Sequence, residues 1–179
     1  MLASRTPERG PVVVALPTCL YRGPAARARP PGPAKHPRRA VHTAEQSHSL
    51  WATVNICDTR TYRNDLGVRG QMPTLGFPAS MFMVVQVDFW SADQHRFLPI
   101  QSNLATTRLS LGTNANGLQQ DGAVFPFSAH TGLLNATVTF IWTRAGKIIG
   151  QTVRRTTAGH TDAAHGNPPR FSAAQCRIK

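Results

Sequence analysis

Long apolar runs, glutamate and cysteine are all scarce in this chain of 179 residues. No apolar run approaches the roughly 18 residues that a helix needs to cross a membrane, so the sequence predicts no membrane span. The motifs G-x-S-x-G and H-E-x-x-H are absent, as is a glycine-rich phosphate loop that leads into a helix. From residue 48 onward every acidic residue is an aspartate, and no two of them lie at strand or helix spacing. These absences argue against an enzyme, and we expect no catalytic residue and no cofactor.

The charge is strongly one-sided, with 20 Lys and Arg against 8 Asp and Glu, which gives a net charge of +12. Seventeen of the basic residues are arginines, and alanine, glycine and proline are abundant, as is typical of a GC-rich coding sequence. The basicity therefore has two interpretations. One is codon bias, and the other is selected binding to a polyanion such as nucleic acid or an acidic polymer.

The first 47 residues differ in composition from the rest. Arg5 and Arg9 precede an apolar stretch over residues 11–21, which is the order found in a secretory signal, but Pro17 interrupts the stretch. Residues 22–47 are mostly Pro, Ala, Arg and Gly, and such a segment cannot bury enough apolar surface to offset its ordering entropy. We therefore predict a disordered extension over residues 1–47, possessing at most a degraded signal region, followed by one domain over residues 48–179.

Apolar residues in the predicted domain recur with a period of two, which indicates β-strands. The clearest segments are residues 50–57 and 80–90, in which Met81, Met83, Val85, Val87 and Phe89 share one face. The same alternation places Phe82, Trp90, Phe140 and Trp142 in the core. Further strands are predicted at residues 66–72, 97–100, 105–111, 123–127 and 174–178, and the clearest hairpin at residues 134–143 and 148–157.

The spacing of these segments favours a particular fold class. We expect an all-β protein, an antiparallel β-sandwich of about seven or eight strands with immunoglobulin-like architecture, and a closed barrel is the alternative. Residues 117–122 are predicted as a polar loop, and no segment has the pattern of an amphipathic helix. Gly146 can supply the positive φ of a tight turn between the strands at 134–143 and 148–157.

The cysteines lie at positions 19, 57 and 176. Cys57 ends the first predicted strand and Cys176 lies in the last, so a disulfide between them would join the two ends of the domain and close a loop of about 120 residues. Such a bond requires an oxidising compartment. Two buried free thiols are the alternative.

His160, Asp162 and His165 form an H-x-D-x-x-H cluster, and imidazole and carboxylate groups are suitable ligands for zinc or a similar cation. The spacing matches no helical zinc motif, and glycines flank the cluster on both sides. We therefore expect a solvated polar loop and no metal site, with these three residues as the candidate ligands if a metal does bind.

Several segments resemble a known family. They are LWATVNICDT at 50–59, GVR at 67–69 with MP at 72–73, RRTTAGH at 154–160 and SAAQC at 172–176. They resemble uncharacterised, secreted, single-domain proteins of high-GC Gram-positive bacteria. The resemblance implies a signal peptide, one β-sandwich domain, and a cysteine after the first strand that is matched by one near the end. It transfers no catalytic residue.

The sequence thus leads to the expectation of a non-enzymatic module that is secreted or held at the cell surface, with a structural or binding role and a protein or cell-envelope partner. One alternative is a polyanion-binding protein that uses the arginine-rich N-terminal segment and the basic domain. Another is a metal-dependent hydrolase built on His160, Asp162 and His165.

Overall fold

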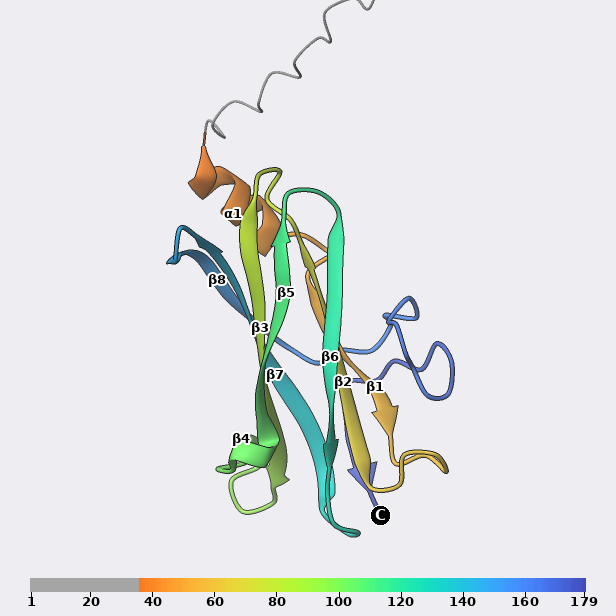
Figure 1. The fold of residues 1–179 in the computed structure, drawn as a ribbon. Helices are drawn as coiled ribbons and strands as arrows, with labels where there is room; N and C mark the ends of the chain where they lie inside the picture. The colour runs from red at the N-terminus through yellow and green to blue at the C-terminus, as the bar shows by residue number, and fades with distance from the viewer. Residues whose placement is uncertain (1–35) are drawn as a thin grey trace, which may run out of the picture. The chain divides into compact units, whose positions relative to one another are not determined.

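The structure, a computed structural model, describes residues 36–179, and most of these residues belong to β-strands (Figure 1). The elements are α1 Pro37–Glu45, β1 Trp51–Cys57, β2 Asp65–Pro73, β3 Ala79–Ser91, β4 Arg96–Pro99, the 3₁₀ turn η1 Asn103–Ala105, β5 Thr106–Asn114, β6 Leu118–Pro126, β7 Gly132–Arg144, β8 Lys147–Arg155 and β9 Cys176–Ile178. The predicted all-β class is confirmed. Residues 1–35 of the predicted extension lie outside the described residues.

The strands form two antiparallel sheets that pack on one another, as a sandwich requires. The first sheet has three strands in the order β1-β2-β6. The second has six strands and is centred on the long strands β3 and β7, which pair with each other. The other edge of β3 pairs with β4 and β5, and the other edge of β7 pairs with β8 and β9.

The core lies between the two sheets, where the alternating apolar residues meet. Met81, Met83, Val85 and Val87 of β3 are buried there, as the alternation predicts. Trp142 of β7 is also fully buried, and its indole Nε1 donates a hydrogen bond to the carbonyl oxygen of residue 73 at 3.0 Å. The largest fully buried side chains are Trp142, Phe140, Leu66, Met72, Met81, Met83, Leu134 and Ile178.

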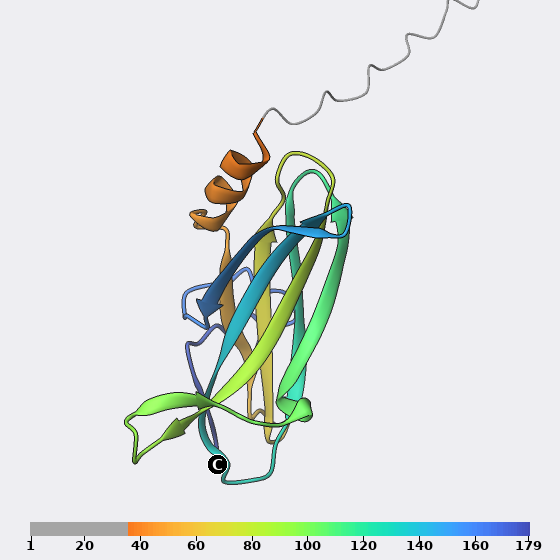
Figure 2. The same ribbon diagram turned by 90° about the vertical axis from the view of Figure 1, so that its left-hand side faces the viewer.

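The alternation of β3 fails beyond Val87. Asp88 is buried, whereas Phe89 and Trp90 are 38% and 41% exposed. The predicted core position of Trp90 is therefore wrong, because β3 continues into a hairpin with β4 that projects from the body of the sandwich (Figure 2). Phe82 is only half-buried and lies under the guanidinium of Arg108, whose Cζ is 4.4 Å from the ring centroid.

Residues 117–122 are not the predicted polar loop. Residues 118–122 form the first half of β6 and pair with β2, for example Gln120 with Gln71. The polar side chain of Gln120 has partners on the outer side of this strand, namely the side chain of Gln71 and the backbone N–H of Ala164. The turn between β7 and β8 is as predicted, and both Ala145 and Gly146 have positive φ, 49° and 77°.

The helix α1 was not predicted, and it lies inside the segment expected to be disordered. It starts with Pro37 at its first turn, where a missing backbone N–H costs nothing. Its buried residues are Val41 and Ala44, which pack beside β8. The predicted boundary at residue 48 is therefore too late, because α1 over Pro37–Glu45 packs on the domain.

Candidate functional site

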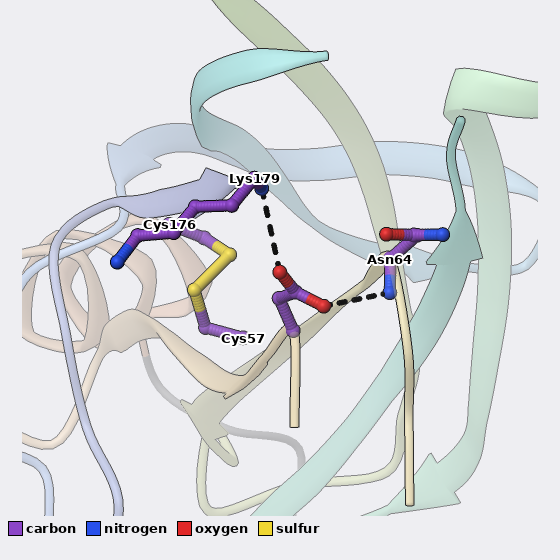
Figure 3. Close-up of a disulfide and its surroundings, with 5 residues drawn as sticks. Cys57, Asn64, Cys176 and Lys179 are labelled. Atoms are coloured by element: carbon purple, nitrogen blue, oxygen red, sulfur yellow. Dashed lines mark hydrogen bonds between the residues drawn. A yellow bond between two sulfur atoms is a disulfide. The ribbon is translucent and has the colours of Figure 1, made fainter. Parts of the chain in front are cut away.

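A disulfide joins Cys57 at the end of β1 to Cys176 at the start of β9, as predicted (Figure 3). The two Cα atoms are 5.3 Å apart, and the residues are separated by 119 positions in the sequence. Because β1 belongs to the three-stranded sheet and β9 to the six-stranded sheet, the bond is a covalent link between the two layers.

Asp58 follows Cys57 in the sequence and connects two backbone segments, one at Asn64 and one at Lys179. Its Oδ1 accepts a hydrogen bond from the backbone N–H of Asn64 at 2.9 Å, and its Oδ2 accepts one from that of Lys179 at 3.3 Å. These two bonds lower the pKa of Asp58 below its ordinary value of 3.8, and the bond from Asn64 has the larger effect. The carboxylate therefore holds the β1–β2 turn and the last residue of the chain together.

The segment 157–173, which we call the C-terminal strap, lies along the free edge of β1 (blue loops beside β1 in Figure 1). The N–H of Thr157 donates to the carbonyl of Ala52 at 2.8 Å, and Val54 and Ala173 exchange two backbone hydrogen bonds of 2.9 and 3.0 Å. The strap thus gives backbone partners to an edge strand that would otherwise be open to pairing with another chain.

A layer of polar side chains lies between the strap and the outer face of the three-stranded sheet. Thr53, Asn55 and Gln71 are buried in it although they point away from the core. Asn55 Nδ2 donates to the carbonyl of Ala164 at 3.0 Å, and Gln120 Oε1 accepts from the N–H of Ala164 at 3.0 Å. Gln120 Nε2 also donates to Gln71 Oε1 at 2.8 Å. These bonds hold the strap against the sheet.

The three candidate metal ligands all lie in the strap. His160 stacks on Trp51 with ring centroids 4.6 Å apart, and its Nε2 is 2.9 Å from Thr157 Oγ1. Burial lowers the pKa of His160, and the charge of Asp162 opposes this shift in part. His165 is exposed and contributes its carbonyl oxygen, which accepts from Asn55 Nδ2 at 3.2 Å. Within residues 36–179, no three His, Cys, Asp or Glu side chains come together as a metal site, so the cluster is part of how the strap is held.

Sequence reasoning missed an exposed aromatic surface on the β3–β4 hairpin. Trp90 and Phe97 pair across the two strands with ring centroids 5.2 Å apart and ring planes at 66°. Phe89 and Leu98 form the next pair and lie on the opposite face of the hairpin, since neighbouring residues of a strand alternate. We call these four residues the hairpin cluster. The alternation along β3 alone could not predict that this part of the strand leaves the sandwich to pair with β4.

Comparison with known proteins leaves the function open. No protein-family model matches the sequence, and no curated protein matches it significantly. No helix in the described part of the chain is long and apolar enough to cross a membrane. The function therefore has to be inferred from the residues themselves.

Proposed function

We propose that this protein is a non-enzymatic, extracytoplasmic β-sandwich module, immunoglobulin-like in architecture, that binds a partner protein through the hairpin cluster. The observation that carries the proposal is the 41% exposure of Trp90, in contact with Phe97, on a hairpin that projects from the sandwich. Large apolar side chains grouped at the surface of a small domain commonly mark an interaction site.

The disulfide supports the extracytoplasmic location. Bonds such as Cys57–Cys176 form and persist in oxidising compartments, whereas the cytosol keeps thiols reduced. The resemblance of the sequence to secreted proteins of high-GC Gram-positive bacteria supports the same location.

The geometry of the aromatic pair favours a protein partner over a sugar or a nucleic acid base. Stacking on a sugar or base requires a flat, accessible ring face, and the edge-on contact of Phe97 with Trp90 does not form a continuous platform. A protruding tryptophan with a second aromatic beside it suits insertion into an apolar pocket, which is how interface hot spots act. Because the chain carries a net charge of +12, we expect an acidic rim around that pocket.

The test is a hairpin variant, Trp90→Ala with Phe97→Ala, beside Leu104→Ala as the matched control. Among residues 36–179, Leu104 is the most exposed large apolar residue, at 83%, and it lies outside the hairpin. A partner captured from the envelope and culture medium of the producing cells is purified, and its affinity for each variant is measured by calorimetry. We expect the double variant to bind about 30-fold or more weakly and the control to bind as the native protein does.

Equal affinity of the native and double-variant proteins would overturn the hairpin assignment, as would the absence of any hairpin-dependent partner. The location has its own test, which is the intact mass of the natively produced protein with and without reductant. A mass with free thiols at Cys57 and Cys176 would contradict export.

Polyanion binding is the second candidate, and one feature favours it. Arg60, Arg63 and Lys179 line an open depression of about 430 Å³ next to the disulfide. If this surface binds polyanions, retention on heparin will fall steeply between low and moderate salt, and Arg60→Gln with Arg63→Gln will reduce the slope. Retention that is insensitive to salt would remove this candidate.

A further inference from the structure

Arg69 is a largely buried cation that lacks full compensation. It lies in the middle of β2, its side chain is 14% exposed, and its Nε has no hydrogen-bond partner among the described residues. Its ion pair with Asp121, the one it makes within residues 36–179, is long, since Nη1 and Oδ1 are 4.0 Å apart. Asp121 Oδ1 also accepts the backbone N–H of Gly122 at 2.8 Å, which directs the carboxylate toward the backbone. A buried charge with so few partners is costly, and its retention calls for an explanation.

Arg69 lines a cavity of about 190 Å³ on the outer side of the three-stranded sheet. The strap contributes His165 to the wall, and β1 contributes Asn55. Gly122 of β6 lies opposite Arg69 of β2 and adds no side chain to the cavity. The apolar side chains of the remaining wall are Ile56 and Val124, with Tyr62 beside them. Val68 and Ala123 also line the cavity, but their side chains pack into the core on the other face of the sheet.

We propose that this cavity binds a small organic carboxylate with a short apolar chain. A guanidinium and a carboxylate match in charge and in planar, two-pronged geometry, so the ligand would supply the compensation that Arg69 lacks. The apolar wall would contact the carbon chain. The volume is below the roughly 300 Å³ of sites for drug-sized molecules, so the ligand has only a few non-hydrogen atoms.

The lining also explains why a carboxylate fits better than phosphate. Phosphate presents oxygens in all directions, and those facing Ile56 and Val124 would lose water without gaining a partner. A carboxylate places both oxygens on one side, toward Arg69. This cavity shares no residue with the hairpin cluster, so carboxylate binding can be tested independently of the proposed protein partner.

The experiment titrates the full chain with acetate, propionate, butyrate and inorganic phosphate at constant ionic strength, with chloride as the reference salt. Binding is followed by the backbone amide resonances of Asn55 and Gly122 and by the shift in melting temperature. We expect saturable shifts for the carboxylates, with butyrate or propionate at least about threefold tighter than acetate. No saturable shift beyond chloride, or tighter binding of phosphate, would overturn the proposal.

Variants locate the ligand. Arg69→Gln should abolish the shifts, and Arg108→Gln, which removes an exposed arginine on the other sheet, should leave them unchanged. If Arg69→Gln does not fold, Val124→Phe provides the second test, because Val124 is exposed at the cavity and a larger side chain there would block it. We expect Val124→Phe to weaken butyrate binding by about tenfold or more, and native affinity in this variant would overturn the site.

Discussion

Gly150 of β8 lies directly against Val41 of α1, so close that a Cβ atom at position 150 would overlap Cγ1 of Val41. The absence of a side chain at Gly150 therefore lets the helix approach the strand. The guanidinium of Arg154 in β8 donates a hydrogen bond to the carbonyl of Glu45 and so holds the C-terminal end of the helix. These contacts fix a nine-residue helix that would be marginal in isolation.

Substitution Gly150→Ala should destabilise the domain by about 1–3 kcal/mol, because the added methyl group overpacks the contact with Val41. Urea unfolding followed by circular dichroism measures the change. In the double variant Gly150→Ala with Val41→Ala, the second truncation makes room for the first, so part of the loss should be recovered. Strictly additive effects of the two substitutions would show that the residues are not in contact.

Removal of the disulfide by Cys57→Ala with Cys176→Ala should lower the free energy of unfolding by about 2–5 kcal/mol. The bond closes a loop of 119 residues and joins the two sheets, so its loss frees the unfolded chain and uncouples the layers. The urea midpoints of the parent and of the disulfide-free variant are compared, and both proteins contain Cys19→Ser, which prevents thiol exchange with Cys19. An unchanged midpoint of the Cys19→Ser parent in reductant would contradict the prediction.

Asp58 should contribute stability that is lost in acid. Its folded-state pKa lies below its ordinary value of 3.8, so the contribution is complete above that value and is lost as the pH falls through the folded-state pKa. Asp58→Asn should therefore lower the melting temperature at neutral pH, and the difference from the native protein should shrink in acid. A difference that is constant from neutral pH to about pH 2 would show that the charge is not responsible.

Asp88 should behave in the opposite way. Burial raises its pKa, and the hydrogen bond from Thr137 Oγ1 at 2.7 Å and the charge of Arg155 oppose that shift only in part. Its ionisation therefore costs stability as the pH rises from 3.8 through the raised folded-state pKa. Asp88→Asn keeps an acceptor for Thr137 and should melt higher than the native protein at neutral pH. A lower melting temperature at neutral pH would mean that the charge pairs favourably with Arg155.

The strap should loosen on acidification because of His160. Burial lowers the pKa of His160 below its ordinary value of 6.5, so the strap is fully stabilised above that pH and loses stability as the pH falls through the folded-state pKa. The indole N–H resonance of Trp51, on which His160 stacks, reports the change. His160→Phe keeps an aromatic ring on Trp51 without a titrating group, and its Trp51 resonance should not move over this range. Identical titration of Trp51 in both proteins would assign the change to another group.

The strands could be predicted from the sequence where one face of a strand meets the core. Met83 and Val85 illustrate this, since each alternates with a less buried neighbour along β3. The pairing of Cys57 with Cys176 could also be predicted, because their positions at the two ends of the domain left a single partner for each.

The features that sequence reasoning missed depend on distant segments. The helix α1 buries only Val41 and Ala44, which is too few apolar residues to give a helical pattern. Its stability comes from Gly150, more than a hundred positions away. Arg69 likewise appears as an ordinary polar residue of a strand, and the cavity that it lines is completed by His165 of the strap. No local pattern records such contacts.

The link between Cys57 and Cys176 also decides how the domain responds to a pulling force at its C-terminal end. β9 has only three residues, and a strand this short would peel from β7 under a small load. With the disulfide in place, tension applied at Lys179 passes through Cys176 to Cys57 and is carried by β1 and its ladder with β2. Residues beyond Cys176 can be drawn out, but the chain before it cannot follow until that ladder yields.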